Sequence, residues 1–417
     1  MVSQSQLQSQ SLAACRILRD VLFMTLRHRL LPGLLFATLP GTLVPQRGVG
    51  PIEAPALQRL LRDAEVAHSD AVVVWKDGQK VGAWYFGKVP RRIEAMSATK
   101  SIVNLAIGRL VTTGAIRSID DSVSTYYPEW RQGKKRAITI RQLLDHTSGM
   151  QSDGSREVES SPDVVQLALA AELSDEPGTH FYYNNKAVNL LAGIVQKASG
   201  KKMDTLLRDE VFAPLGITDF AWVRDSAGSP YSYARLQILP EDMAKLGQLM
   251  LDRGRWNGTQ LIASEWFDVS MRGSTAEPRC GLLWWLIPEH TTFVVDDERI
   301  RALRAAGADS AFLRAATDMR GRYESLDAYT NALRRAFGDK YWEPYGDARS
   351  RTRMDLERRE YDRMIGYEAN GSFGQYIVIY PDQRIVAVRM IAATDKFDVS
   401  TDSFDHFREL VRALAPH

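Results

Sequence analysis

Cysteine is scarce in this sequence, and so is any excess of charge of one sign. Cys15 and Cys280 are the only cysteines among 417 residues, too few for a disulfide framework and without the paired spacing of a metal site. The 53 basic and 51 acidic residues leave a net charge of +2, so no strong positive field attracts nucleic acid, and we expect no nucleic-acid partner. With 45% hydrophobic residues, the composition is that of a globular enzyme or binding protein.

Two catalytic signatures are also missing. None of the seven histidines stands in an HExxH pattern or beside a CxxC pair, so we expect no zinc or other metal. A GxSxG nucleophile elbow is absent, which argues against an α/β-hydrolase.

The first fifty residues differ from the rest. They are rich in arginine with a single acidic residue, and residues 30–44 carry no charge. This run is shorter than the roughly 20 residues of a membrane-spanning helix, and a basic stretch before a short apolar run is typical of a secretory signal. If Met24 is the true start, the basic and apolar parts have the normal proportions of a secretory signal. We expect a leader over 1–50 and export to the periplasm. The alternative is an amphipathic helix, about 11–31, which packs on the body or brings residues 11–44 to a membrane surface.

Two β-hairpins are predicted far apart in the chain. Residues 71–75 and 80–86 are apolar, β-branched and aromatic runs that flank Asp77-Gly78, a strong hairpin signal. Residues 374–380 and 384–392 flank a second turn near the C-terminus, and a helix over 403–414 follows. We expect the two hairpins to share one antiparallel sheet.

Periodicity predicts a mostly helical middle. Its expected helices are 97–113, 161–172, 187–199 and 240–253. Residues 288–365 are richer in Arg, Asp and Glu, with helical patches at 297–319 and 325–337. We interpret them as a helical insertion or lid, with a solvated, poorly ordered excursion as the alternative. The expected division is a leader (1–50), a discontinuous sheet lobe (51–96 and 366–417), a helical lobe (97–287) and the insertion (288–365).

Ser97 and Lys100 form the first candidate catalytic pair. Positions three apart share a helical face, so Lys100 can reach the Ser97 hydroxyl. A serine hydroxyl needs a nearby base to become a nucleophile, and a lysine whose pKa is lowered by burial can serve. The helix N-terminus would also favour a developing oxyanion. By itself this pattern also fits a capping serine with a solvated lysine.

A tyrosine and an asparagine two residues apart form the second candidate. Within residues 177–185 (PGTHFYYNN), the registers Tyr182/Asn184 and Tyr183/Asn185 both fit. The phenol can relay a proton and the amide can hold an acyl carbonyl. A turn with buried aromatics is the alternative.

In this order, the motifs resemble the serine β-lactamase-like superfamily, which includes class C β-lactamases, penicillin-binding proteins and family VIII esterases. The resemblance runs from about residue 64 to 393, interrupted by 288–365. Its segments are MSATKS (96–101), LLDHTSGM (143–150), PGTHFYYNN (177–185), WNGTQLIASEW (256–266), GLLWW (281–285) and GSFGQYIVIYPDQRIVAVR (371–389). It implies an α/β (α+β) fold of the β-lactamase/transpeptidase type: an antiparallel sheet flanked by helices, a mostly helical lobe, and an active site between them.

The resemblance selects one of the two tyrosine registers. The family spacing from the Pro-Gly pair implies Tyr183 and Asn185 as site residues, with Tyr182 a cleft-lining or core aromatic. His146, in the HTSG box, is implied to be structural rather than catalytic.

The family's third motif aligns with Ala369-Asn370-Gly371. Relatives place a lysine where Ala369 stands, or a histidine or tryptophan in a variant of the motif, and the lysine usually helps to bind a substrate carboxylate. Alanine forms no ion pair, so the departure favours neutral esters or amides. The resemblance further implies an oxyanion hole made by the backbone N–H groups of Ser97 and Ser372, beside Gly371.

The implied activity is that of a serine hydrolase that cleaves carboxylic esters, or amides, through an acyl-enzyme on Ser97, with Lys100 and Tyr183 as the proton-transfer pair. The partner is then a small-molecule substrate, and no cofactor is implied. The alternatives are a β-lactamase or D-Ala-D-Ala-type peptidase, and a non-catalytic binding relative.

Two further departures concern the cleft. Residues 232–236 replace a glycine-rich turn of the relatives. The insertion is expected to cap the site with aromatic residues such as Tyr341 and Trp342.

Overall fold

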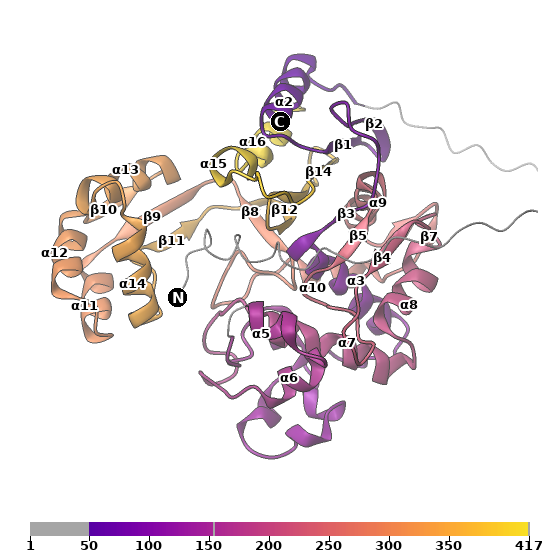
Figure 1. Ribbon diagram of the computed structural model, residues 1–417, viewed down its shortest axis with the longest axis horizontal. Helices are drawn as coiled ribbons and strands as arrows, with labels where there is room; N and C mark the ends of the chain where they lie inside the picture. Colours follow the sequence, from indigo (N-terminus) through magenta and orange to yellow (C-terminus); the bar gives the residue numbers. More distant parts are fainter. Residues whose placement is uncertain (1–49, 153–154, 416–417) are drawn as a thin grey trace, which may run out of the picture.

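A six-stranded antiparallel sheet organises the computed structural model, which describes residues 50–152 and 155–415 (Figure 1). The strand order is β2-β1-β14-β13-β12-β8. These strands are β1 (Ala71–Lys76), β2 (Gln79–Trp84), β8 (Trp285–Pro288), β12 (Met364–Gly371), β13 (Gln375–Tyr380) and β14 (Ile385–Met390). The predictions for the leader, the start at Met24 and the membrane contact fall on residues that lie outside the described part.

The two distant hairpins share this sheet, as predicted. β1 pairs with β14 in antiparallel register, with Val73 opposite Val388. Alternate side chains of each strand point to opposite faces, and helices cover both faces. α2 (Ala54–Val66) and α16 (Phe407–Arg412) pack on one face, whereas α9 (Pro240–Leu251) packs on the other. The C-terminal helix is shorter than predicted, because the chain breaks at Phe404 (φ 55°) between α15 (Val399–Asp402) and α16.

A fully buried arginine ties both ends of the chain to this sheet. Arg389 on β14 donates hydrogen bonds to Ser69 Oγ and to the carbonyl oxygens of Ala67, Phe373, Gly374 and Asp402. Burial lowers the pKa of its guanidinium to about 10, which leaves it charged at neutral pH. Because two of its acceptors lie in the β12–β13 turn, Arg389 fixes the turn that follows the third motif.

The helical lobe is built around α3 (Thr99–Thr112), which is buried on nearly all sides. Its other helices are α4 (Ile140–Leu144), α5 (Ser155–Ser160), α6 (Val164–Ala170), α7 (Asn185–Ser199), α8 (Met203–Leu207) and α10 (Ser264–Ser270). Short strands accompany them: β3 (Ile93–Glu94), β4 (Phe220–Trp222), β5 (Leu236–Ile238), β6 (Arg255–Trp256) and β7 (Thr259–Gln260). The predicted helices are present, with ends that differ by up to three residues.

The insertion projects from the sheet at the left of Figure 1 and has an apolar core of its own. Its elements are β9 (Thr291–Val295), α11 (Asp297–Ala305), α12 (Ser310–Asp318), β10 (Gly321–Tyr323), α13 (Leu326–Phe337), α14 (Trp342–Thr352) and β11 (Arg358–Tyr361). The expectation of a purely helical insertion missed the sheet β10-β9-β11, whose strands of three to five residues are too short for a clear alternating pattern. The expected boundary at 287/288 also cuts β8, which belongs to the main sheet. Within the described chain, no helix combines the length and apolar character needed to cross a membrane.

Candidate active site

Ser97 lies where the third motif meets the start of α3. It occupies a 3-10 turn over Met96–Ala98, with φ of 47° at Met96, rather than the first turn of the α-helix. A Cβ added to Gly371 would lie 2.6 Å from the Ala95 carbonyl oxygen and 2.9 Å from the Ser97 backbone nitrogen. Only glycine therefore permits this approach of β12, and the third motif lies beside Ser97 as the resemblance implied.

Lys100 is buried one helical turn after Ser97. Its Nζ donates hydrogen bonds to Ser97 Oγ at 3.1 Å and to the Tyr233 carbonyl oxygen at 2.8 Å. No carboxylate among the described residues pairs with it, and burial holds the pKa of its ammonium well below the usual value for lysine. This environment favours the neutral amine, which is the form that can accept a proton from Ser97.

Tyr183 completes the group. Its ring lies over Lys100, with Nζ 4.7 Å from the ring centroid. Burial raises the pKa of its hydroxyl, and interaction with Ser97 opposes the rise. The phenol is therefore protonated at neutral pH, beside both Ser97 and Lys100.

The other register, Tyr182/Asn184, has a different role. Asn184 caps α7, since its side chain accepts the Ala187 N–H and donates to the Met150 carbonyl oxygen. The side chain of Tyr182 is 51% exposed and does not line the pocket, so the expectation of a cleft-lining or core aromatic is wrong. One residue further, the exposed fraction falls to 37% at Tyr183, which faces the pocket.

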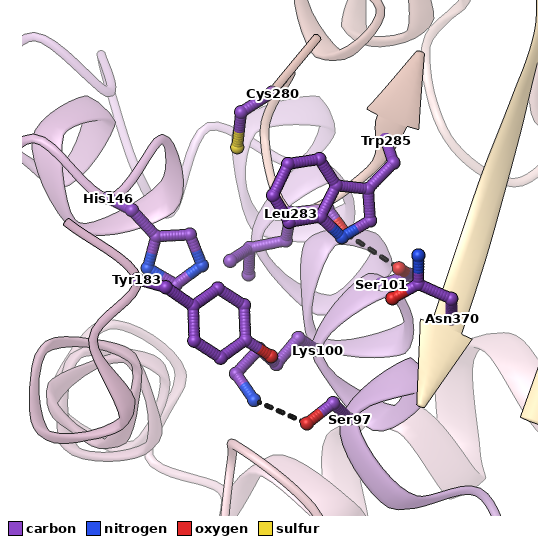
Figure 2. A pocket seen from close by; sticks show the side chains of 9 residues that line it. All are labelled: Ser97, Lys100, Ser101, His146, Tyr183, Cys280, Leu283, Trp285 and Asn370. Carbon is purple, nitrogen blue, oxygen red and sulfur yellow. Dashed lines mark hydrogen bonds between the residues drawn. The ribbon is translucent and has the colours of Figure 1, made fainter. Parts of the chain in front are cut away.

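A small pocket of about 260 Å³, counting its open mouth, brings these groups together (Figure 2). Its lining comes from the sheet, the helical lobe and the loop before β8: Ser97, Lys100, Ser101, His146, Tyr183, Cys280, Leu283, Trp285 and Asn370. Trp285 stacks on Tyr183 with an interplanar angle of 18°. The pocket is small for a ligand site.

Four of the predicted binding residues do not line this pocket. Ala369 is fully buried in the core, and Ser372 is exposed after the end of β12. Gly371 contributes by its close approach to Ser97. Asn185 begins α7, and its buried Oδ1 has no hydrogen-bond partner among the described residues.

Sequence reasoning missed five lining residues: Ser101, Cys280, Leu283, Trp285 and Asn370. Helical spacing from Lys100 could have found the first, because Ser101 is the next residue of α3 and lies four positions after Ser97. Asn370 is the middle residue of the third motif, but the motif itself assigned no role to that side chain.

The expected aromatic cap is placed elsewhere. Tyr341 packs against the insertion's own core and Trp342 is exposed, so neither lines the pocket. The insertion instead reaches the loop before the tyrosine motif through Arg353, which pairs with Asp175 at 3.2 Å.

His146 is a buried neutral histidine against Tyr183. Its Nδ1 accepts the Asn184 backbone N–H, and its ring centroid lies 4.7 Å from that of Tyr183. Burial, and then the charge of Lys100, lower the pKa of the imidazole to about 3. A structural role in holding the tyrosine loop accounts for these contacts.

This pKa makes stability depend on pH. Between pH 6.5 and about 3 the unfolded chain binds a proton at His146 that the folded chain does not, so its contribution is complete above pH 6.5 and is lost as the pH falls. We expect His146→Asn, which tolerates the φ of 60°, to reduce the acid dependence of the unfolding free energy by about 1.4 kcal/mol per pH unit below pH 6. Urea denaturation at pH 7 and pH 5 gives the unfolding free energy at each pH. An equal change between the two pH values in the wild type and in His146→Asn would contradict this prediction.

Comparison with known families agrees with this geometry. The family model described as Beta-lactamase matches residues 57–406, which is most of the chain. The chain belongs to the Beta-lactamase family. Proteins of this family are typically serine hydrolases, and their fold is the α/β arrangement with an antiparallel sheet expected for this sequence.

Individual relatives of this Beta-lactamase family member are distant. Protein flp of Staphylococcus aureus (strain COL) is 31% identical over 136 residues, which cover 30% of this chain and 27% of that protein. The chain thus spans little more than a quarter of the curated relatives it first matches. The structure of EstCE1, titled a hydrolase with promiscuous acyltransferase activity, matches with a TM-score of 0.57 at 15% identity, over 86% of this chain and 98% of that one. The penicillin binding protein from Bacillus halodurans matches with a TM-score of 0.51 at 16% identity, over 82% and 98%.

Proposed function

We propose that this chain is a serine hydrolase that cleaves small carboxylic esters through an acyl-enzyme on Ser97. The observation that carries the proposal is the 3.1 Å hydrogen bond between Ser97 Oγ and a buried Lys100 that no described carboxylate neutralises. As Oγ attacks the ester carbonyl, its proton passes to Lys100 Nζ, directly or through Tyr183. The same pair then protonates the departing alkoxide, and the acyl group stays on Oγ.

Water completes the reaction. Tyr183, with Lys100 beneath its ring, passes its phenolic proton to the neutral amine as it takes a proton from a water molecule that attacks the acyl-enzyme. Ser97 recovers a proton from this pair as the acid leaves. The backbone N–H groups of Ser97 and Ser372 are the proposed oxyanion donors, and the close approach of Gly371 to the Ser97 nitrogen supports this. Removing one such donor costs roughly 10²- to 10³-fold in rate.

Ester substrates are favoured over β-lactams by the third motif. Ala369 is buried and uncharged, and no lysine or arginine is among the pocket residues apart from Lys100. The esterase-like neighbour named above is consistent with this choice. The similarity to a penicillin binding protein supports a second candidate function, that of a β-lactamase or D-Ala-D-Ala-type peptidase with the same acyl-enzyme chemistry.

A covalent probe and two chromogenic substrates test the proposal. We expect a fluorophosphonate to add one phosphonyl group to the full chain, which peptide mass spectrometry places on Ser97. We also expect kcat/KM for p-nitrophenyl butyrate to exceed that for a chromogenic cephalosporin. Faster cephalosporin turnover would support the second candidate, whereas an unlabelled protein without turnover would indicate a non-catalytic binding relative.

A further inference from the structure

The side chain of Asn370 points from β12 into the pocket, on the side opposite Tyr183 (Figure 2). It is the polar side chain that the third motif contributes there, because Ala369 is buried in the core. Its neighbour Gly371 packs against the Ser97 backbone nitrogen. Consecutive Cα atoms are about 3.8 Å apart, so a substrate group that reaches Asn370 lies close to an acyl carbonyl held at Ser97.

A buried carboxylate sets the orientation of this amide. Glu368, two residues earlier on the same face of β12, is 1% exposed, and its Oε1 accepts a hydrogen bond from Asn370 Nδ2 at 3.2 Å. Arg408 of α16 pairs with the same oxygen at 3.5 Å. A carboxylate only accepts hydrogen bonds, so the amide nitrogen must face Glu368 and Asn370 Oδ1 is left for the pocket.

The local chemistry is therefore that of an acceptor whose amide is held by an ion pair, Glu368 with Arg408. Glu368 Oε2 is buried without a hydrogen-bond partner among the described residues. A substrate carboxylate would meet an amide oxygen here and no cation. A substrate N–H or O–H would complete a hydrogen bond.

We propose that Asn370 Oδ1 is a specificity-determining acceptor, and that the preferred substrates are esters whose acyl group carries a hydrogen-bond donor one or two atoms from the scissile carbonyl, as in N-acylamino esters. Glu368 acts through Asn370 as a positioning residue. This inference rests on the proposed ester hydrolysis and names the class of acyl group that the same site selects.

A matched pair of substrates isolates this contact. The p-nitrophenyl esters of N-acetylglycine and of 4-oxopentanoic acid have the same length and leaving group, and differ by N–H against CH₂. After each kcat/KM is divided by the rate of hydroxide-catalysed hydrolysis, we expect the wild-type protein to prefer the N–H ester by about 3- to 10-fold, the worth of one net hydrogen bond.

Two variants test the two roles. Asn370→Leu, of similar size but without an acceptor, should bring the ratio to about 1. Glu368→Gln should lower the ratio as well. Glutamine can donate a hydrogen bond, so the Asn370 side-chain amide can flip and present its nitrogen to the pocket. The control is Glu298→Gln, the same substitution at an exposed position of α11, which should keep the wild-type ratio. Thermal unfolding shows whether each variant is folded. If Glu368→Gln does not fold, Asn370→Leu alone decides whether Asn370 determines specificity.

The outcomes separate this inference from the proposed function. A wild-type ratio near 1 with both esters hydrolysed, or a preference that survives in Asn370→Leu, would overturn the role of Asn370 and leave ester hydrolysis intact. Absence of turnover of both esters would overturn the proposed function itself, and this inference with it.

Discussion

Replacing Ser97 with alanine is expected to lower kcat for a p-nitrophenyl ester by about 10⁴- to 10⁶-fold, the range found when a nucleophilic serine is removed from a hydrolase. Two serine hydroxyls face the pocket, and their hydrogen bonds distinguish them. Ser97 Oγ accepts from the Lys100 amine, whereas Ser101 Oγ donates to the Leu283 carbonyl oxygen at 2.6 Å and so ties α3 to the loop before β8. Only Ser97 has a base beside it.

Measurement combines turnover with labelling. Ser97→Ala should lose fluorophosphonate labelling entirely, while Ser101→Ala, the matched control in the same helix, should still be labelled. Removing the Ser97 hydroxyl leaves the surrounding backbone in place, so we expect the thermal unfolding temperature of Ser97→Ala to stay close to that of the wild type. Labelling of Ser97→Ala at the wild-type rate would place the nucleophile at another residue.

The pairing of Ser97 with Lys100 was predictable because it is local. Spacing of three residues and a helical start bring the two side chains together whatever the rest of the chain does. The choice between Tyr183 and Tyr182 came from family spacing instead, since the two registers are equivalent by local geometry. The structure explains that choice, because Asn184 caps α7 and the chain turns Tyr183, rather than Tyr182, toward the pocket.

The loop before β8 could not be placed from sequence. Its pocket residues Cys280 and Leu283 come from an irregular segment without periodicity, and Trp285 follows it as the first residue of β8. Contacts that span more than 150 residues hold it, among them the bond from Asn104 Nδ2 to the Leu282 carbonyl oxygen at 2.8 Å. Such contacts arise only when segments far apart in the chain are brought together by folding.

The main sheet shows which features local sequence patterns predict and which depend on tertiary contacts. Apolar, β-branched and aromatic runs around turn residues predicted each hairpin, and the structure buries nearly every residue of β1 and β14 in one shared sheet. By contrast, the orientation of Asn370 depends on Glu368, a buried carboxylate that pairs with Arg408 of the C-terminal helix. Secondary-structure patterns hold no information on that third partner.

Replacing Lys100 with methionine is expected to lower kcat/KM for the same ester by about 10³- to 10⁴-fold, near the upper end for loss of a general base. Methionine has nearly the same length and no charge, so the buried site keeps its packing and loses the cost of holding an amine away from water. We therefore expect unchanged or slightly higher thermal stability, which separates a catalytic loss from misfolding. A double substitution with Ser97→Ala should be no less active than Ser97→Ala alone, because the base acts through the serine.

The pH profile identifies the base. Catalysis by Lys100 requires the neutral amine, so kcat/KM should rise with pH through the lowered pKa of Lys100 and level off above it. This acid limb should lie well below pH 10.5, the ordinary pKa of a lysine side chain. Lys100→Met should lose the limb along with the activity, and Tyr183→Phe should keep it while losing rate. A Lys100→Met variant whose residual activity shows the wild-type limb would assign the first proton transfer to another group. The candidate is then Tyr183, whose hydroxyl interacts with Ser97.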